Sequence, residues 1–197
     1  MKKPFFILIL ALAISIAGCK ERLPEHPINS IFDAAESGNV SKLREYVSRS
    51  ADINALNAND NSALMLAVVN HHVEAAKLLI NSGANPNIKH RYGADLIMLS
   101  LSNVKDPSID MLNYTISLGL NVNYVTPDGE SALDIAIDAK HLAAVKRLVQ
   151  VGAKPSQKAM RLIKDPGYPQ SEIIEIIIKT SNKYLTSVAT QAKSTHT

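Results

Sequence analysis

The stretch Gly83–Asn87 reads Gly-Ala-Asn-Pro-Asn, and it decides the fold because its pattern returns along the chain. Related segments occupy residues 50–54 (SADIN), 119–123 (GLNVN) and 152–156 (GAKPS), so successive segments begin 33, 36 and 33 residues apart. A period of this length indicates a stacked array of small structural repeats. Three of the four segments open with a glycine, at Gly83, Gly119 and Gly152. Each of these glycines is expected to end a helix, where a left-handed backbone costs glycine little.

A second set of positions repeats in the same register. Leu64, Ile97 and Leu133 are also 33 and 36 residues apart. Two segments that contain these positions, Asn61–Ala67 (NSALMLA) and Glu130–Ala136 (ESALDIA), resemble the T-P-L-H-x-A turn and helix start of the ankyrin repeat. The resemblance implies an all-α fold, an ankyrin-repeat solenoid of stacked helix-turn-helix units with β-turn tips.

The resemblance extends over residues 31–183 and implies about five units, of which the first and last act as caps. Unit three contains a three-residue insertion at Asn103–Pro107, which we interpret as a tolerated surface loop. The alternative for this insertion is a contact with a partner. In unit five, Ser171 is expected to cap a last helix over Glu172–Asn182. The solvent-facing side of that helix should hold Glu172, Glu175 and Lys179.

The second helix of each unit is expected to bury one apolar side against its neighbours. Residues at helical spacing define this side, namely Val73, Ala76, Lys77, Leu78 and Ile80 in unit two, and Leu142, Val145, Leu148 and Val149 in unit four.

Residues 1–18 are predicted to be a lipoprotein signal peptide. Two lysines precede an apolar run over residues 5–17, which is shorter than the about 20 residues that a membrane-spanning helix needs. Ile16–Cys19 (IAGC) resembles the lipobox of bacterial lipoproteins, which implies cleavage before Cys19 and lipidation of this cysteine. The alternative is an ordinary signal peptide with an incidental cysteine. We favour lipidation because the chain has one cysteine and therefore no disulfide partner for it.

The lipid on Cys19 would attach the chain to a membrane, with residues 19–30 as the anchored linker and residues 184–197 as a polar, disordered tail. The lipobox family's sorting rule, applied to Lys20, implies the periplasmic side of the outer membrane. Without the two N-terminal lysines the formal charge falls from +3 to +1. No Lys/Arg-rich run remains, so nucleic acid is not expected as a partner.

The sequence contains no nucleophile elbow, no zinc-protease motif and no phosphate-binding loop. We therefore predict no catalytic residue, no cofactor and no metal, and we do not expect an enzyme. Adjacent His71 and His72 point in different directions from a helix, which suits a metal poorly. The resemblance places them at the family's Gly-His positions, where histidine has a structural role at the start of a helix.

Asp134 and Asp138 lie four residues apart on one face of a predicted helix. Paired carboxylates can serve acid–base chemistry. In the ankyrin resemblance, however, this face is the solvated inner wall of the stack. We therefore expect two exposed acids on a binding wall, extended by Asp128 and Glu130.

The ankyrin resemblance also implies a partner-binding surface made of turn tips and first-helix faces. Arg91 and Tyr92 stand out in it because these residue types often dominate interface energetics. The alternative for either residue is a solvated tip without any contact. The surface would suit a mixed-charge partner better than a polyanion. The predicted partner-binding residues are Asn59, Asn61, Asn70, Arg91, Tyr92, Ser102, Asn103, Asp128, Glu130 and Asp138.

These observations predict a lipid-anchored protein-binding module that is a monomer when unbound. Small lipoproteins with repeat domains resemble immunity proteins, which implies a secreted toxic effector, such as a phospholipase, as the partner. The alternative is an envelope scaffold or an oxidative-stress-protection partner. An enzyme would need a nucleophile–base pair, for which the sequence offers no candidate. A host-directed effector does not fit a lipid anchor.

Overall fold

The computed structural model describes residues 30–49, 51–102, 109–165 and 172–182. Within these residues the chain forms consecutive helix pairs and no extended strand. The pairs are α1 (Ile31–Glu36) with α2 (Val40–Ser48), α3 (Ala63–Val69) with α4 (Val73–Asn81), α5 (Leu96–Leu99) with α6 (Ile109–Ser117), and α7 (Ala132–Asp138) with α8 (Leu142–Gln150). Helix α9 (Gln157–Leu162) follows, and residues 172–182 are helical.

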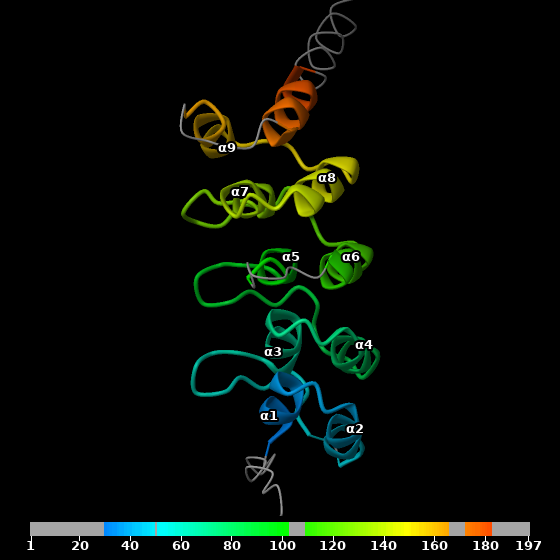
Figure 1. The fold of residues 1–197 in the computed structure, drawn as a ribbon. Coiled ribbons are helices and arrows are strands. Elements are labelled where there is room, and N and C mark those ends of the chain that lie inside the picture. Colours follow the sequence, from blue (N-terminus) through cyan, green and yellow to red (C-terminus); the bar gives the residue numbers. More distant parts are fainter. Residues whose placement is uncertain (1–29, 50, 103–108, 166–171, 183–197) are drawn as a thin grey trace, which may run out of the picture.

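The pairs stack into an elongated array (Figure 1). The first helices α1, α3, α5, α7 and α9 form one column, and the second helices α2, α4, α6 and α8 form a parallel column. Three loops, which join α2 to α3, α4 to α5 and α6 to α7, project in a row on the side of the first helices. The expected all-α ankyrin-repeat solenoid is therefore confirmed.

The first helices are short, at four to seven residues, and each starts at a polar N-cap. In α3, for example, the Ser62 hydroxyl accepts a hydrogen bond from the Met65 backbone N–H at 3.1 Å. Asp95 and Ser156 make the same kind of cap on α5 and α9. Such caps satisfy otherwise free N–H groups, but helices this short are stable only when they are packed.

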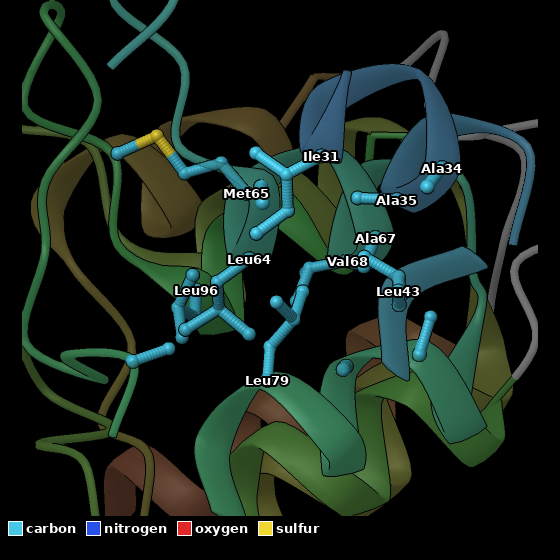
Figure 2. Close-up of a cluster of buried hydrophobic side chains, with 14 of the residues drawn as sticks. Ile31, Ala34, Ala35, Leu43, Leu64, Met65, Ala67, Val68, Leu79 and Leu96 are labelled. Carbon is cyan, nitrogen blue, oxygen red and sulfur yellow. The ribbon is translucent and has the colours of Figure 1, made fainter. Parts of the chain in front are cut away.

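Packing comes from apolar side chains that meet between successive units. In Figure 2, Leu64 of α3 lies close to Leu96 of α5, and Met65 of α3 and Leu79 of α4 belong to the same cluster. These side chains are at most 1% exposed. Alanines such as Ala67, which is fully buried, let the helices approach closely. Since each unit covers its neighbour, no unit could bury its apolar side alone.

The second helices follow the expected pattern in unit four but only partly in unit two. In α8, Val145 and Leu148 are buried and their predicted neighbours are half-buried. In α4 the buried residues are Ala75, Ala76 and Leu79. Lys77 is exposed and pairs with Glu74 at 2.8 Å, so its assignment to the apolar side was wrong. The reason is its place on the helix, which lets the charged end reach water and a carboxylate one turn away.

The turns agree with the sequence analysis. Gly83, Gly119 and Gly152 follow second helices with φ of 95°, 74° and 93°, as expected for left-handed helix ends. At the turn between the helices of unit two, His71 has φ of 60° and His72 is the N-cap of α4. The His72 Nε2 atom lies 2.9 Å from the Glu36 carbonyl oxygen of unit one. The histidine pair thus has the structural role that we expected.

The last helix also matches its prediction in the part that can be compared. Residues 172–182 are helical, and Glu172, Glu175 and Lys179 are exposed. Ile173 and Ile177 are fully buried against the stack. The Lys146 ammonium pairs with Glu172 at 2.6 Å, which links this helix to α8. The proposed cap Ser171, the insertion Asn103–Pro107 and the tail from residue 184 lie outside the described residues.

Candidate functional site

Three hairpin tips, which we call tip 1 (residues 57–61), tip 2 (residues 90–94) and tip 3 (residues 126–130), have one shared geometry. In each, the backbone N–H of the first residue donates to the carbonyl of the fifth at 2.8 to 2.9 Å. The fourth residue has a left-handed backbone in all three, with φ of 61° at Asp60 and 84° at Gly93. The tips are thus defined structures, and the loops that carry them project at intervals along the stack (Figure 1).

Tips 2 and 3 also pack directly on each other. The Tyr124 hydroxyl donates to the Gly93 carbonyl at 2.9 Å. A Cβ atom at Gly93 would lie 2.6 Å from Pro127 Cδ, so this approach requires glycine. The Lys89 ammonium lies 3.8 Å from the centre of the Tyr124 ring and 3.7 Å from the buried Asp95 carboxylate. These contacts fix the two tips relative to each other before any partner arrives.

Arg91 and Tyr92 project from tip 2 into solvent, as predicted. Tyr92 is 65% exposed, the largest value among the exposed large apolar side chains of the described residues. Its ring lies 5.0 Å from the His90 ring, and the Arg91 guanidinium lies 4.9 Å from its centre. Stacking holds the tyrosine without covering it, so a large aromatic surface beside a cation is available for binding.

Tip 3 is acidic and contacts unit five. Asp128 is exposed, whereas Glu130 is half-buried and pairs with Lys158 of α9 at 2.5 Å. The hydrogen bond that Lys158 donates to Glu130 raises the pKa of Lys158, and the charges of Glu130, Asp134 and Asp138 act in the same direction. Asp138 is exposed on the first-helix face.

A shallow groove lies beside tip 3. It has a volume of about 460 Å³ and is lined by Glu130, Ile135, Asp138 and Ala139. Two of the predicted binding acids, Glu130 and Asp138, therefore border one depression whose wall includes an apolar side chain.

Asp134 does not lie on the binding wall, and its predicted exposure was wrong. It is fully buried, and its carboxylate accepts hydrogen bonds from the Ser131 hydroxyl at 2.6 Å and the Ser131 backbone N–H at 2.8 Å. The Ser156 hydroxyl at 2.5 Å and the Ala159 backbone N–H at 3.1 Å donate from unit five. A buried carboxylate is tolerated because several donors replace its water. Asp134 is a structural link between units four and five.

The other predicted binding residues differ in their exposure and in their hydrogen bonds. Asn59 and Ser102 are exposed. Asn61 is half-buried, and its backbone N–H donates to the Asn57 side chain within tip 1. Asn70 is exposed, but its amide donates to the Leu66 carbonyl at 2.9 Å, where α3 ends. Asn103 and the lipidation residue Cys19 lie outside the described residues.

Two exposed apolar side chains on the hairpins were not predicted from the sequence. Leu56 is 52% exposed and Val125 is 47% exposed, each just before its tip. They occupy the position that Lys89 holds in unit three, at the spacings of 33 and 36 residues. The charged Lys89 was the available signal that this position faces solvent. An apolar residue alone does not reveal it, because apolar residues usually indicate a core.

The described residues offer neither a metal cluster nor a membrane-spanning helix. Within the described residues, no three His, Cys, Asp or Glu side chains gather closely enough to hold a metal ion. Among the same residues, the helices are all too short or too polar to cross a bilayer.

Comparison with known proteins identifies the repeats. A family model described as "Ankyrin repeats (many copies)" matches residues 31–80. The mitochondrial disaggregase of Bos taurus is 29% identical over 155 residues, which cover 76% of this chain and 22% of the disaggregase. The putative ankyrin repeat protein YahD of Escherichia coli is 24% identical over 157 residues, which cover 74% of this chain and 76% of YahD.

A third similar protein is protein lin-12 of Caenorhabditis elegans, which is 29% identical over 131 residues. These residues cover 64% of this chain and 9% of lin-12. The chain therefore spans about a fifth of the disaggregase and less of lin-12. With the stacked helix pairs and the hairpin tips, these matches support ankyrin repeats as the building units of the described residues, and such repeats imply a protein–protein interaction module.

Proposed function

We propose that this interaction module is a lipid-anchored periplasmic immunity protein, which binds a secreted toxic effector such as a phospholipase and neutralises it. The observation that carries the binding part of the proposal is the exposed pair Arg91 and Tyr92 on tip 2. Arginine and tyrosine are enriched among residues that dominate binding energy. Tip 2 is also fixed by its contacts with tip 3, so that binding costs little ordering of the backbone.

The charges around tip 2 favour a protein partner with a mixed-charge surface. Arg91 on tip 2 is cationic, and Asp128 on tip 3 is anionic. A polyanion such as a nucleic acid would be attracted by the first and repelled by the second. A protein surface can offer both signs at the required positions, together with a pocket for the Tyr92 ring.

The anchor and the compartment in the proposal rest on the sequence of the N-terminal residues. The apolar run and the IAGC motif that ends at Cys19 support lipidation, and Lys20 supports the outer membrane. A stable anchor needs more than one acyl chain, which the resemblance to lipoproteins implies. A membrane-held inhibitor suits an effector that attacks the same membrane, and this is why we favour a phospholipase.

The test is a pull-down with the full chain from the envelope and secreted fractions of its own organism. We expect the chain to retain a secreted toxic enzyme and to block its activity. The double variant Arg91→Ala, Tyr92→Ala should weaken this complex about tenfold or more. The matched control is Glu175→Ala, Lys179→Ala, which removes two exposed charges from the last helix and should leave binding unchanged.

Two outcomes would change the proposal. Retention of resident envelope proteins or of a peroxide-detoxifying enzyme alone would replace the immunity role with the scaffold or stress-protection role. Equal binding by the tip variant and the control would show that the partner contacts another part of the chain.

A further inference from the structure

The exposed charges on the tip side of the stack alternate in sign from unit to unit. Unit two carries Asp60 on tip 1, and unit three carries Arg91 on tip 2. Unit four carries Asp128 on tip 3, and unit five carries Lys158 and Arg161 on α9. All five side chains are exposed. The order of charges along the stack is therefore negative, positive, negative, positive.

These charges share one side of the molecule. The three tips project in a row from the first-helix column in Figure 1. Lys158 of unit five belongs to the same side because its ammonium contacts Glu130 of tip 3. The alternating pattern is thus a property of one surface, which we call the tip surface and define by Asp60, Arg91, Asp128 and Lys158.

The centre of the tip surface keeps one cation and one anion available. Lys89 is engaged by Asp95 and Tyr124, and Glu130 is engaged by Lys158. Among the described residues, no ion pair within 4.0 Å involves Arg91 or Asp128. Neighbouring tips therefore present opposite charges that the chain itself leaves unmatched at this distance.

We infer that a second copy of this chain docks on the tip surface about a twofold axis that passes between units three and four. Such an axis brings unit three of one copy opposite unit four of the other, and unit two opposite unit five. Arg91 then faces Asp128 of the other copy twice, and Asp60 faces unit five twice, where Lys158 also pairs with Glu130 of its own copy. A surface whose charge order is negative, positive, negative, positive is complementary to itself in this arrangement, and the axis between units three and four is the one that places all four units opposite a unit of the other sign.

Exposed apolar side chains fit the same arrangement. Tyr92 of unit three is 65% exposed and Val125 of unit four is 47% exposed. The axis brings these two tip regions opposite each other, so that each copy supplies an aromatic surface and an aliphatic one. The contact surface consists of hairpin tips and short helix faces, which favours a weak, salt-sensitive dimer of the transient class.

This inference does not depend on the proposed function, because it requires only the chain itself. It replaces the unbound monomer that we expected from the sequence. It also places the dimer contact on Arg91 and Tyr92, which the proposed partner would need. A partner would then compete with the second copy for the tip surface.

Sedimentation velocity of the full chain, kept in a mild detergent because of its apolar N-terminal run, tests the inference. We expect a concentration-dependent dimer at about 0.02 M salt and a monomer at about 0.5 M salt, where charges are screened within a few ångströms. Arg91→Glu and Asp128→Arg should each raise the dissociation constant about tenfold or more, since each places like charges opposite each other twice. Circular dichroism should show that both variants remain folded.

The decisive measurement is the mixture of the two variants. In a mixed dimer, Glu at position 91 faces Arg at position 128, and the remaining Arg91 faces the remaining Asp128, so both pairs are restored. The mixture, and the double variant Arg91→Glu, Asp128→Arg by itself, should therefore dimerise like the original chain. Monomers in the mixture, or a dimer that ignores salt, would overturn the inference. Neither result would affect a complex detected in the pull-down.

Discussion

Met65 and Asp134 occupy the same position in units two and four, as the third residue of the first helix, yet they join their units to the next in different ways. Both are buried, with Met65 1% exposed and Asp134 fully covered. Met65 packs among apolar side chains from units one to three. Asp134 instead accepts hydrogen bonds from the Ser156 hydroxyl and the Ala159 backbone N–H of unit five.

The difference shows that a repeat junction can be made by apolar packing or by directed hydrogen bonds. Apolar packing is non-directional and tolerates any neighbour of the right shape. Hydrogen bonds to a buried carboxylate fix the position of the donors. Unit five has no hairpin before α9, which follows Ala153 after only a few residues. The carboxylate of Asp134 therefore holds α9, which has no hairpin of its own to join it to unit four.

The largest loss of stability should come from Met65→Asp, which places an aspartate in unit two at the position that Asp134 occupies in unit four. In Met65→Asp, the new carboxylate would approach the N-cap of α5, which is the buried Asp95 and not a serine. Two buried carboxylates would then lie close together without a cation for the new one. We expect a loss of about 4 kcal/mol or more in the free energy of unfolding, measured by urea denaturation of the full chain.

The control for this variant is Met65→Leu, which keeps the volume and should cost less than about 1.5 kcal/mol. If Met65→Asp were as stable as Met65→Leu, the two junctions would be interchangeable and the comparison would be wrong.

A smaller effect is expected from removing the carboxylate in unit four. Asp134→Ala leaves the buried Ser131 backbone N–H and the Ser131 and Ser156 hydroxyls without their acceptor, and it leaves the Ala159 N–H with only its bond to the Ser156 hydroxyl. We expect a loss of about 2 to 3 kcal/mol, together with faster hydrogen exchange of the α9 amides. Asp134→Asn keeps one acceptor oxygen, so its free energy of unfolding should fall between those of Asp134→Ala and the original chain. Unchanged exchange in α9 would show that Asp134 does not hold unit five.

The two junctions also show what the sequence could predict. The 33-residue period, the helix-ending glycines and the exposure of Tyr92 follow from local patterns, and the structure agrees with them. The burial of Asp134 was not predicted, because its spacing from Asp138 suggested a solvent-facing helix side, although the repeat register aligns Asp134 with the apolar Met65. What buries it is α9, and unit five departs most from the repeat.

The smallest effect concerns the exposed ion pair that accompanies the Asp134 junction. Lys158 and Glu130 pair across units four and five, but their side chains are 48% and 39% exposed. We expect Lys158→Met to cost only about 0.5 kcal/mol at neutral pH, because solvent screens such a pair. Lys164→Met, which alters an exposed lysine just after α9, is the matched control and should cost less.

The contribution of the Lys158–Glu130 pair to stability should depend on pH. Glu130 raises the pKa of Lys158 above its ordinary value of 10.5 in the folded chain. The folded state then holds the lysine proton more tightly than the unfolded state, so the contribution is fully present below pH 10.5 and is lost as the pH rises through the raised pKa. In urea titrations at rising pH, the stability difference between the original chain and Lys158→Met should therefore shrink above that value. A difference that persists at the highest pH would mean that Lys158 stabilises the junction through the packing of its aliphatic chain and not through its charge.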